Sequence, residues 1–129
     1  MAMQNMSAYQ SYQKNKYETA SPHRLTLMLY NGAIQFATRS QEAISLGNIG
    51  DSNLYIQKTQ DIVFELLSSL NEREGGEIAA NLRRIYLYIN DLLLQANLKK
   101  DEQSIVEAIS LLKELQSAWE QIGKEVTLG

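Results

Sequence analysis

Four stretches of the chain repeat apolar residues at intervals of three and four, and polar or glycine-containing segments separate them. This spacing predicts amphipathic helices over residues 22–46, 52–70, 77–98 and 101–122. The sequence has no run of alternating apolar and polar residues between turns, which would indicate a strand. Short connections make consecutive helices antiparallel. The expected fold class is therefore all-α, an antiparallel up-down four-helix bundle over residues 21–123.

Capping and breaking residues set the expected ends of these helices. Ser21 followed by Pro22 is a start signal, because serine accepts backbone hydrogen bonds at the N-cap and proline lacks an N–H that would go unpaired. The other expected boundaries are Gly47 and Gly50 after the first helix, Asp51 or Ser52 capping the second, a polar turn from Asn71 to Gly76, Asp101 opening the fourth helix and Gly123 ending it. We expect residues 1–20 to form a flexible N-terminal tail and residues 124–129 a C-terminal tail.

Two of the four helices carry more apolar residues than one buried face uses. On the first helix the expected core face is Leu25, Met28, Leu29, Gly32, Phe36 and Ala43, and the opposite side carries Leu27, Tyr30 and Ile34. On the third helix the expected core face is Ile78, Leu82, Ile85, Tyr86, Ile89, Leu92, Leu93 and Ala96, and a second stripe comprises Ala80, Leu87, Leu94 and Leu98. The second helix looks one-sided, with Leu54 and Phe64 as exceptions, and the fourth buries Ile105, Ile109, Leu112, Leu115, Trp119 and Ile122.

These second stripes call for a physical explanation, because a bundle helix normally needs one apolar face. A leucine left in water forgoes about 1.5–3 kcal/mol of burial. One explanation is that the N-terminal tail or a second copy of the chain covers the stripes. The other is a groove for the helix of another protein, held through residues at positions i, i+3, i+4 and i+7. Periodicity alone does not separate the two, and both hold if a partner displaces the tail.

Composition narrows the class of protein. The chain has 129 residues, no cysteine and a formal net charge of −3, so it fits a single domain without disulfides or cysteine-bound metal. The acidic balance argues against nucleic-acid binding. The first residues have no apolar signal region, and no stretch approaches the roughly 18 apolar residues of a membrane span. We expect a soluble cytoplasmic protein without membrane insertion.

Residues for catalysis or cofactor binding are scarce. The one histidine, His23, is expected to be exposed or locally bonded. The sequence has no Glu-x-x-His pair for a di-iron bundle and no set of histidines for zinc. Gly47-Asn48-Ile49-Gly50 lacks the lysine of a phosphate loop, and the Arg83-Arg84 pair is typical of a solvated helix face. The expectation is a non-enzymatic protein with no cofactor, no metal site and no catalytic residues.

Several strings together resemble one known family. Thr19-Ala20-Ser21-Pro22-His23-Arg24-Leu25, continued by Met28-Leu29-Tyr30-Asn31-Gly32-Ala33-Ile34, is similar to the opening of the flagellar export chaperone family FliS. The block from Gly75 to Leu82 with Tyr86 and Tyr88, then Ala96-Asn97, Asp101 and Ala118-Trp119, match its later spacing. The resemblance covers nearly the whole chain.

The resemblance implies a cytoplasmic chaperone that binds the C-terminal segment of flagellin, prevents its premature polymerisation and helps deliver it to the flagellar type III export apparatus. On this basis the expected flagellin groove comprises Leu27, Tyr30, Ile34, Ala80, Leu87, Leu94 and Leu98, with Tyr9 and Tyr12 in an N-terminal cap. An export-gate component is an expected second partner, and the expected oligomeric state is a monomer or weak homodimer. The alternatives are a homo-oligomeric structural or adaptor bundle and a small all-helical enzyme that binds anions through arginines.

Overall fold

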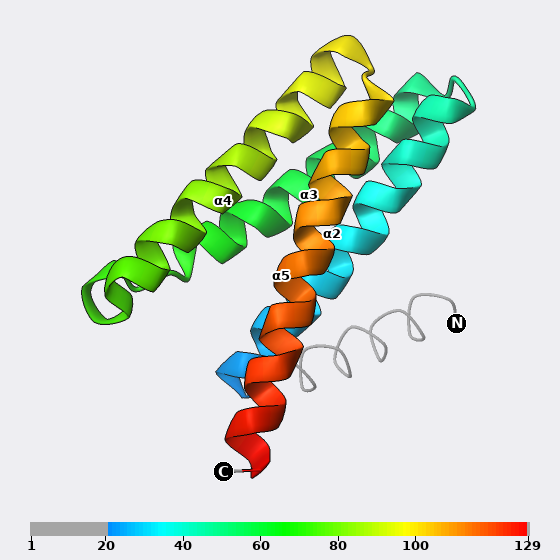
Figure 1. The fold of residues 1–129 in the computed structure, drawn as a ribbon. Helices are drawn as coiled ribbons and strands as arrows, with labels where there is room; N and C mark the ends of the chain where they lie inside the picture. Colours follow the sequence, from blue (N-terminus) through cyan, green and yellow to red (C-terminus); the bar gives the residue numbers. More distant parts are fainter. Residues whose placement is uncertain (1–20, 129) are drawn as a thin grey trace, which may run out of the picture.

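A computed structural model describes residues 21–128 of the chain, with side chains through residue 123. Over this range the chain forms four helices and no strand (Figure 1). The helices are α2 (Pro22–Ser45), α3 (Ile49–Ser68), α4 (Glu72–Lys99) and α5 (Glu102–Leu128). The all-α bundle expected from the apolar spacing is confirmed, while the expected N-terminal tail, with Tyr9 and Tyr12, lies outside the described residues.

Each helix packs against two others, so the four form a closed ring around one core. Helix α2 contacts α3 and α5, and α4 contacts the same two helices from the other side. The contacts of α2 are the more extensive, because small residues such as Ala33 and Ala37 let its backbone approach its neighbours. Figure 1 shows the first turns of α4 well apart from the last turns of α5. Helix α4 is therefore the least tightly held wall of the bundle.

The start of α2 follows the sequence signal closely. Pro22 occupies the first turn, and Ser21 is the N-cap with extended backbone angles. The Ser21 hydroxyl oxygen accepts a hydrogen bond from the Arg24 backbone N–H at 3.1 Å. One of the unpaired donors at the helix N-terminus is thereby satisfied.

Asp101 precedes the first residue of α5 and accepts from the Gln103 N–H at 3.1 Å, as expected, whereas the starts of α3 and α4 differ from those expected. Helix α3 begins at Ile49 rather than after Asp51 or Ser52, because the Asn48 side chain caps it and accepts from the Asp51 N–H at 3.1 Å. The expected polar turn from Asn71 to Gly76 is also wrong. Asn71 caps a first helical turn at Glu72, and the chain then bends at Gly76, whose φ of 55° and ψ of −130° are accessible mainly to glycine.

The core is largely the expected one on three helices and differs on α2. The fully or nearly buried apolar residues of α3, α4 and α5 are Ile56, Val63, Leu66, Ala79, Tyr86, Ile89, Leu92, Leu93, Ala96, Ile105, Ala108, Ile109 and Leu112. The exceptions expected on α3, Leu54 and Phe64, are indeed exposed. Ile78 and Ile122, expected in the core, are exposed, because the first turns of α4 diverge from α5.

The buried face of α2 is rotated from the expected one. It comprises Tyr30, Ala33, Ala37, Ser40 and Ala43, whereas the larger residues expected there, such as Leu25 and Phe36, flank this row and are half-buried. Helix α2 lies between two neighbours, so its line of closest approach carries small residues and its larger side chains spread to either side. The largest apolar residues of α2 therefore do not mark the centre of its buried face.

Gly123 does not end the last helix, as the sequence suggested, but continues it. Helix α5 runs through Gly123 to Leu128. A Cβ atom at position 123 would lie 2.2 Å from Cε1 of His23, so a side chain there would collide with the imidazole ring. Gly123 is therefore explained by the close approach of α2 rather than by a helix end.

Replacing Gly123 by alanine is expected to lower the thermal stability of the bundle. Alanine gains about 1 kcal/mol of helix propensity over glycine, but overpacking against His23 costs about 1–3 kcal/mol. The displaced ring should also alter the fluorescence of Trp119, the one tryptophan of the chain. Gly50→Ala is the matched control, since a Cβ there meets nothing closer than 3.9 Å. Equal melting temperatures and unchanged fluorescence for Gly123→Ala would contradict this account.

Candidate partner-binding surface

A row of apolar side chains runs along α4 outside the core. Leu87, Leu94 and Leu98 are 45%, 49% and 74% exposed, and Ala80 is half-buried. Ala80, Leu87 and Leu94 are one heptad apart, so they lie nearly above one another on the helix surface. These four residues are the second stripe expected from the sequence, and we call them the leucine row. Their exposure agrees with that expectation, and their role in binding stays a prediction.

The leucine row borders the seam between α4 and α3. The Lys100 ammonium donates hydrogen bonds to the side chains of Asn97 on α4 and Asn53 on α3, which fixes the side of each helix that meets the other. Phe64 follows Asn53 by about three helical turns and so lies on the same side of α3. Because α3 and α4 are antiparallel, the part of α4 about three turns before Lys100 lies at the level of Phe64. This part of α4 falls between Leu87 and Leu94. Phe64 is 56% exposed, so an apolar side chain also lines the α3 side of this seam.

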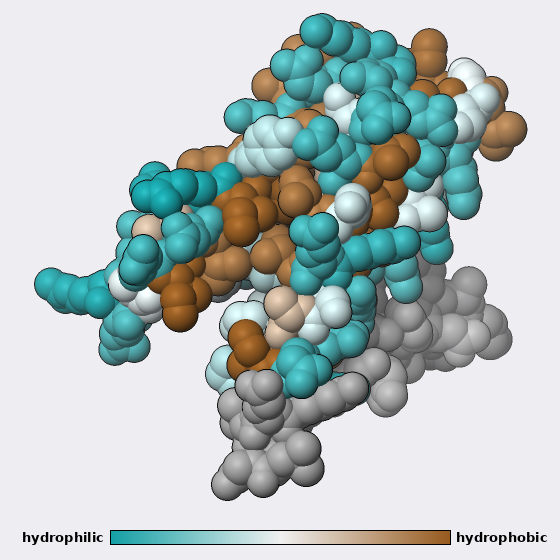
Figure 2. Space-filling view, viewed as in Figure 1, coloured by the Kyte–Doolittle hydropathy of each residue, from teal (hydrophilic) through white to brown (hydrophobic). Residues whose placement is uncertain are grey.

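A second apolar surface lies between α4 and α5. Figure 2 shows hydrophobic residues gathered in the space between these two helices. The hydroxyl of Tyr88 on α4 donates to the Glu107 carboxylate of α5 at 2.5 Å, and this hydrogen bond raises the pKa of Tyr88. Ile85 lies one turn before Tyr88 and Leu111 one turn after Glu107, and both are half-buried. Sequence reasoning placed Ile85 in the core and did not single out Leu111, so it did not predict this surface.

Of the three groove residues expected on α2, one is buried in the core. Tyr30 is 1% exposed and packs in the core, and Ile34 packs against the core at its edge. Leu27 is half-buried. The inclusion of Tyr30 in a groove is therefore wrong, because the core face of α2 is turned toward the side that was taken as its back. The place of Leu27 and Ile34 in a groove stays a prediction. On α3, the sequence analysis did not assign Phe64 to the groove. Its position outside the apolar face of the helix was the one sequence feature that could have indicated an exposed binding residue.

Four ring side chains connect the N-terminus of α2 to α5 and then to α4. His23 stacks on Trp119 with centroids 5.2 Å apart, and the two exchange hydrogen bonds: His23 Nε2–H donates to the Trp119 carbonyl at 2.7 Å and the indole N–H donates to the His23 carbonyl at 2.9 Å. The Trp119 ring meets Tyr30 edge-on at 6.4 Å. His23 is thus bonded to a distant helix, and the expectation of an exposed or locally bonded side chain is wrong.

The network ends in a buried pair of phenols. The hydroxyls of Tyr30 and Tyr86 are hydrogen-bonded at 2.5 Å across the core. Burial raises the pKa of both tyrosines, because the phenolate would lose its hydration. Both phenols therefore stay neutral, and each supplies the polar partner that the other needs inside an apolar core.

Replacing Tyr86 by phenylalanine is expected to lower the free energy of unfolding by about 1–3 kcal/mol, because the Tyr30 hydroxyl is left buried without a partner. The double variant Tyr30→Phe/Tyr86→Phe should lose less than the two single variants added together. Urea unfolding of the four proteins measures this coupling. Strictly additive losses would show that the hydroxyl pair contributes no coupling.

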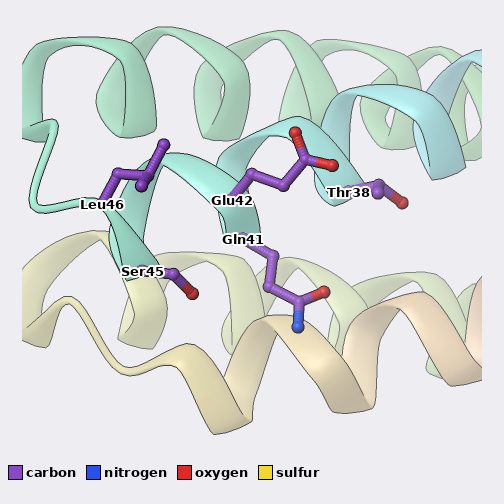
Figure 3. A pocket seen from close by; sticks show the side chains of 5 residues that line it. All are labelled: Thr38, Gln41, Glu42, Ser45 and Leu46. Atoms are coloured by element: carbon purple, nitrogen blue, oxygen red, sulfur yellow. The ribbon is translucent and has the colours of Figure 1, made fainter.

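One surface hollow on α2 is open and shallow. Thr38, Gln41, Glu42, Ser45 and Leu46 line a space of about 510 Å³ (Figure 3). All five belong to one helix or its end, and Ser45 donates to the Glu102 carboxylate of α5 at 2.8 Å. Among the described residues, no group of three or more histidine, cysteine, aspartate or glutamate side chains is arranged to hold a metal ion. Within that part of the chain, no helix is long and apolar enough to cross a membrane.

These features define a class before any comparison: an all-helical bundle whose distinguishing surface is apolar and lies along one helix. The sequence matches the family described as "Flagellar protein FliS" over residues 3–126. The chain belongs to this family.

Individual relatives agree with the family assignment. The chain is 35% identical to "Flagellar secretion chaperone FliS" of Campylobacter jejuni, covering 98% of each chain. It is 36% identical to proteins of the same name from Vibrio cholerae, covering 90% of this chain and 88% of the relative, and from Bacillus subtilis, covering 94% and 88%. A solved structure described as "Crystal structure of flagellar chaperone from bacteria" has the same fold, with a TM-score of 0.77, 20% identity and coverage of 94% and 98%.

Proposed function

We propose that this protein is a cytoplasmic export chaperone that binds the C-terminal segment of flagellin, prevents its premature polymerisation and helps deliver it to the flagellar type III export apparatus. The leucine row, with Phe64 across the α3–α4 seam, is the observation that carries the proposal. Family membership and relatives named secretion chaperones support it. An export-gate component is the second partner that this role implies.

The geometry suits an amphipathic client. The leucine row follows one straight face of α4, and a helix laid along it would meet apolar side chains at heptad intervals. A flagellin segment that is disordered before assembly would become helical on binding, and the cost of ordering offsets part of the burial free energy. Binding of this kind covers the apolar residues of the client and remains reversible, as export requires.

Calorimetric titration with the C-terminal segment of the flagellin from the same organism tests the proposal. We expect one-to-one binding with a negative change in heat capacity, the mark of apolar burial. Binding only by a chain that begins at Thr19 would identify the preceding residues, with Tyr9 and Tyr12, as a cap over the client surface. Absence of binding by both chains, together with concentration-dependent self-association in light scattering, would favour the homo-oligomeric bundle instead.

A further inference from the structure

Asn90 lies on α4 between the core and the leucine row. Leu87 precedes it by three residues and Leu94 follows it by four, so these two exposed leucines are its neighbours on the helix surface. Asn97, one heptad further along α4, lies at the α3 seam beside Lys100. Asn90 therefore faces the same seam, at the level of Phe64 and in the middle of the apolar surface.

The amide of Asn90 is buried and unpaired. Its Oδ1 and Nδ2 atoms are shielded from water and have no hydrogen-bond partner. The other buried polar side chains of the described core are bonded: Ser40, Ser52 and Thr59 donate to carbonyls of their own helices, and Ser104 donates to Asp101. An unsatisfied buried amide destabilises the fold, so the free bundle gains nothing from an asparagine at this position.

The order of polar and apolar residues across this side of α4 is the reverse of that on an ordinary amphipathic helix. Moving outward from the core, one meets first the polar positions Asn90 and Asn97 and only then the exposed Leu87 and Leu94. A partner helix that covers the leucines lies next to these polar positions. A partner that places a hydrogen-bonding group opposite Asn90 pairs an amide that the free bundle leaves unpaired, so it binds better than a partner with an apolar group there.

We propose that Asn90 sets the register of the bound client helix by pairing with a polar side chain, an amide or a hydroxyl, in the middle of the client's apolar face. Pairing with the client requires a small shift of α4 against α3 that brings the amide to the surface, and α4 is the least tightly packed wall of the bundle. In coiled coils a buried asparagine among apolar residues selects one register at a cost in stability. Asn90 lies among Leu87, Leu94 and Phe64, and its unpaired amide carries that cost. The inference rests on the proposed function and specifies how its surface selects a client.

The test compares the wild-type chain with Asn90→Leu and Asn90→Ala in calorimetric titrations with the flagellin C-terminal segment. Each variant is expected to bind about 3- to 10-fold more weakly while unfolding at the same or a higher urea concentration, because a buried hydrogen bond is lost from the complex and an unpaired amide from the free protein. Alanine cannot overpack the seam, so it serves if leucine perturbs the fold. Asn81→Leu is the matched control, since Asn81 is exposed on another face of α4 and should leave binding unchanged.

A double-mutant cycle makes the test specific. Each amide or hydroxyl residue on the apolar face of the client segment is replaced by leucine in turn and titrated against wild type and Asn90→Ala. One client position should weaken binding to wild type and have no further effect on Asn90→Ala. The inference is overturned if Asn90→Ala binds as tightly as wild type, or if no client position couples to it. If the wild-type chain itself binds no client, the proposed function fails and this inference with it.

Discussion

Replacing Leu94 or Leu87 by aspartate is expected to weaken binding of the flagellin C-terminal segment by about 30-fold or more, the effect of losing a central apolar contact. Both side chains are about half exposed in the free bundle, at 49% and 45%, so the folded protein tolerates a charge at either position. In the complex the same carboxylate would be covered by apolar client side chains, and burying an unpaired charge is costly. Calorimetric titration measures the affinity, and far-UV circular dichroism monitors the helices.

The matched control for this prediction is Gln95→Asp. Gln95 is exposed, adjoins Leu94 in sequence and points to another face of α4, so this substitution adds the same charge outside the leucine row. Its affinity for the client should equal that of the wild-type chain. A loss of helical signal in Leu94→Asp would show that the leucine row belongs to the core. Full helicity with full affinity would remove the row from the client surface.

Leu93→Ala is expected to lower the free energy of unfolding by about 2–5 kcal/mol, whereas Leu94→Ala should lower it by less than about 1 kcal/mol. Leu93 is fully buried among the core residues, and truncating it leaves a cavity that its neighbours fill only in part. Leu94 has the same side chain in the same helix and already faces water over half its surface. Urea unfolding of the two variants therefore separates core from surface at consecutive positions.

The same two variants should affect client binding in the opposite order, with the larger loss of affinity in Leu94→Ala. Leu94→Ala removes a contact from the client surface and should reduce affinity, while Leu93→Ala should bind normally at temperatures where it stays folded. Comparable destabilisation by the two variants would mean that both leucines are packed inside the bundle. Equal affinities would mean that the client lies elsewhere, with the apolar surface between α4 and α5 as the next surface to test by Ile85→Asp.

The local features of the fold were predictable because they depend on residues close together in sequence. Ser21 and Pro22 define the start of α2 through contacts within one turn. On α4, the buried Leu93 and the exposed Leu94 follow from helical periodicity alone, since apolar residues cover a wide arc and only one part of it can face the core. The FliS resemblance of the first block likewise resides in one short string.

The remaining features depended on which helix meets which, and spacing along the chain does not contain that information. Helix α2 is apolar on more than one side, so only its position between α3 and α5 decided that Tyr30 is buried. Gly123 looked like a helix end until His23, far away in sequence, was found against it.

The sequence by itself determined four helices, most of their buried faces and the surplus leucines of α4, because these follow from local spacing and capping. Only the tertiary structure decided that those leucines border the α3 seam, that Phe64 joins them and that Asn90 lies beneath them without a partner. The physical reason is that helical periodicity fixes which side chains share a face, whereas burial and hydrogen bonding depend on the neighbour that the face meets.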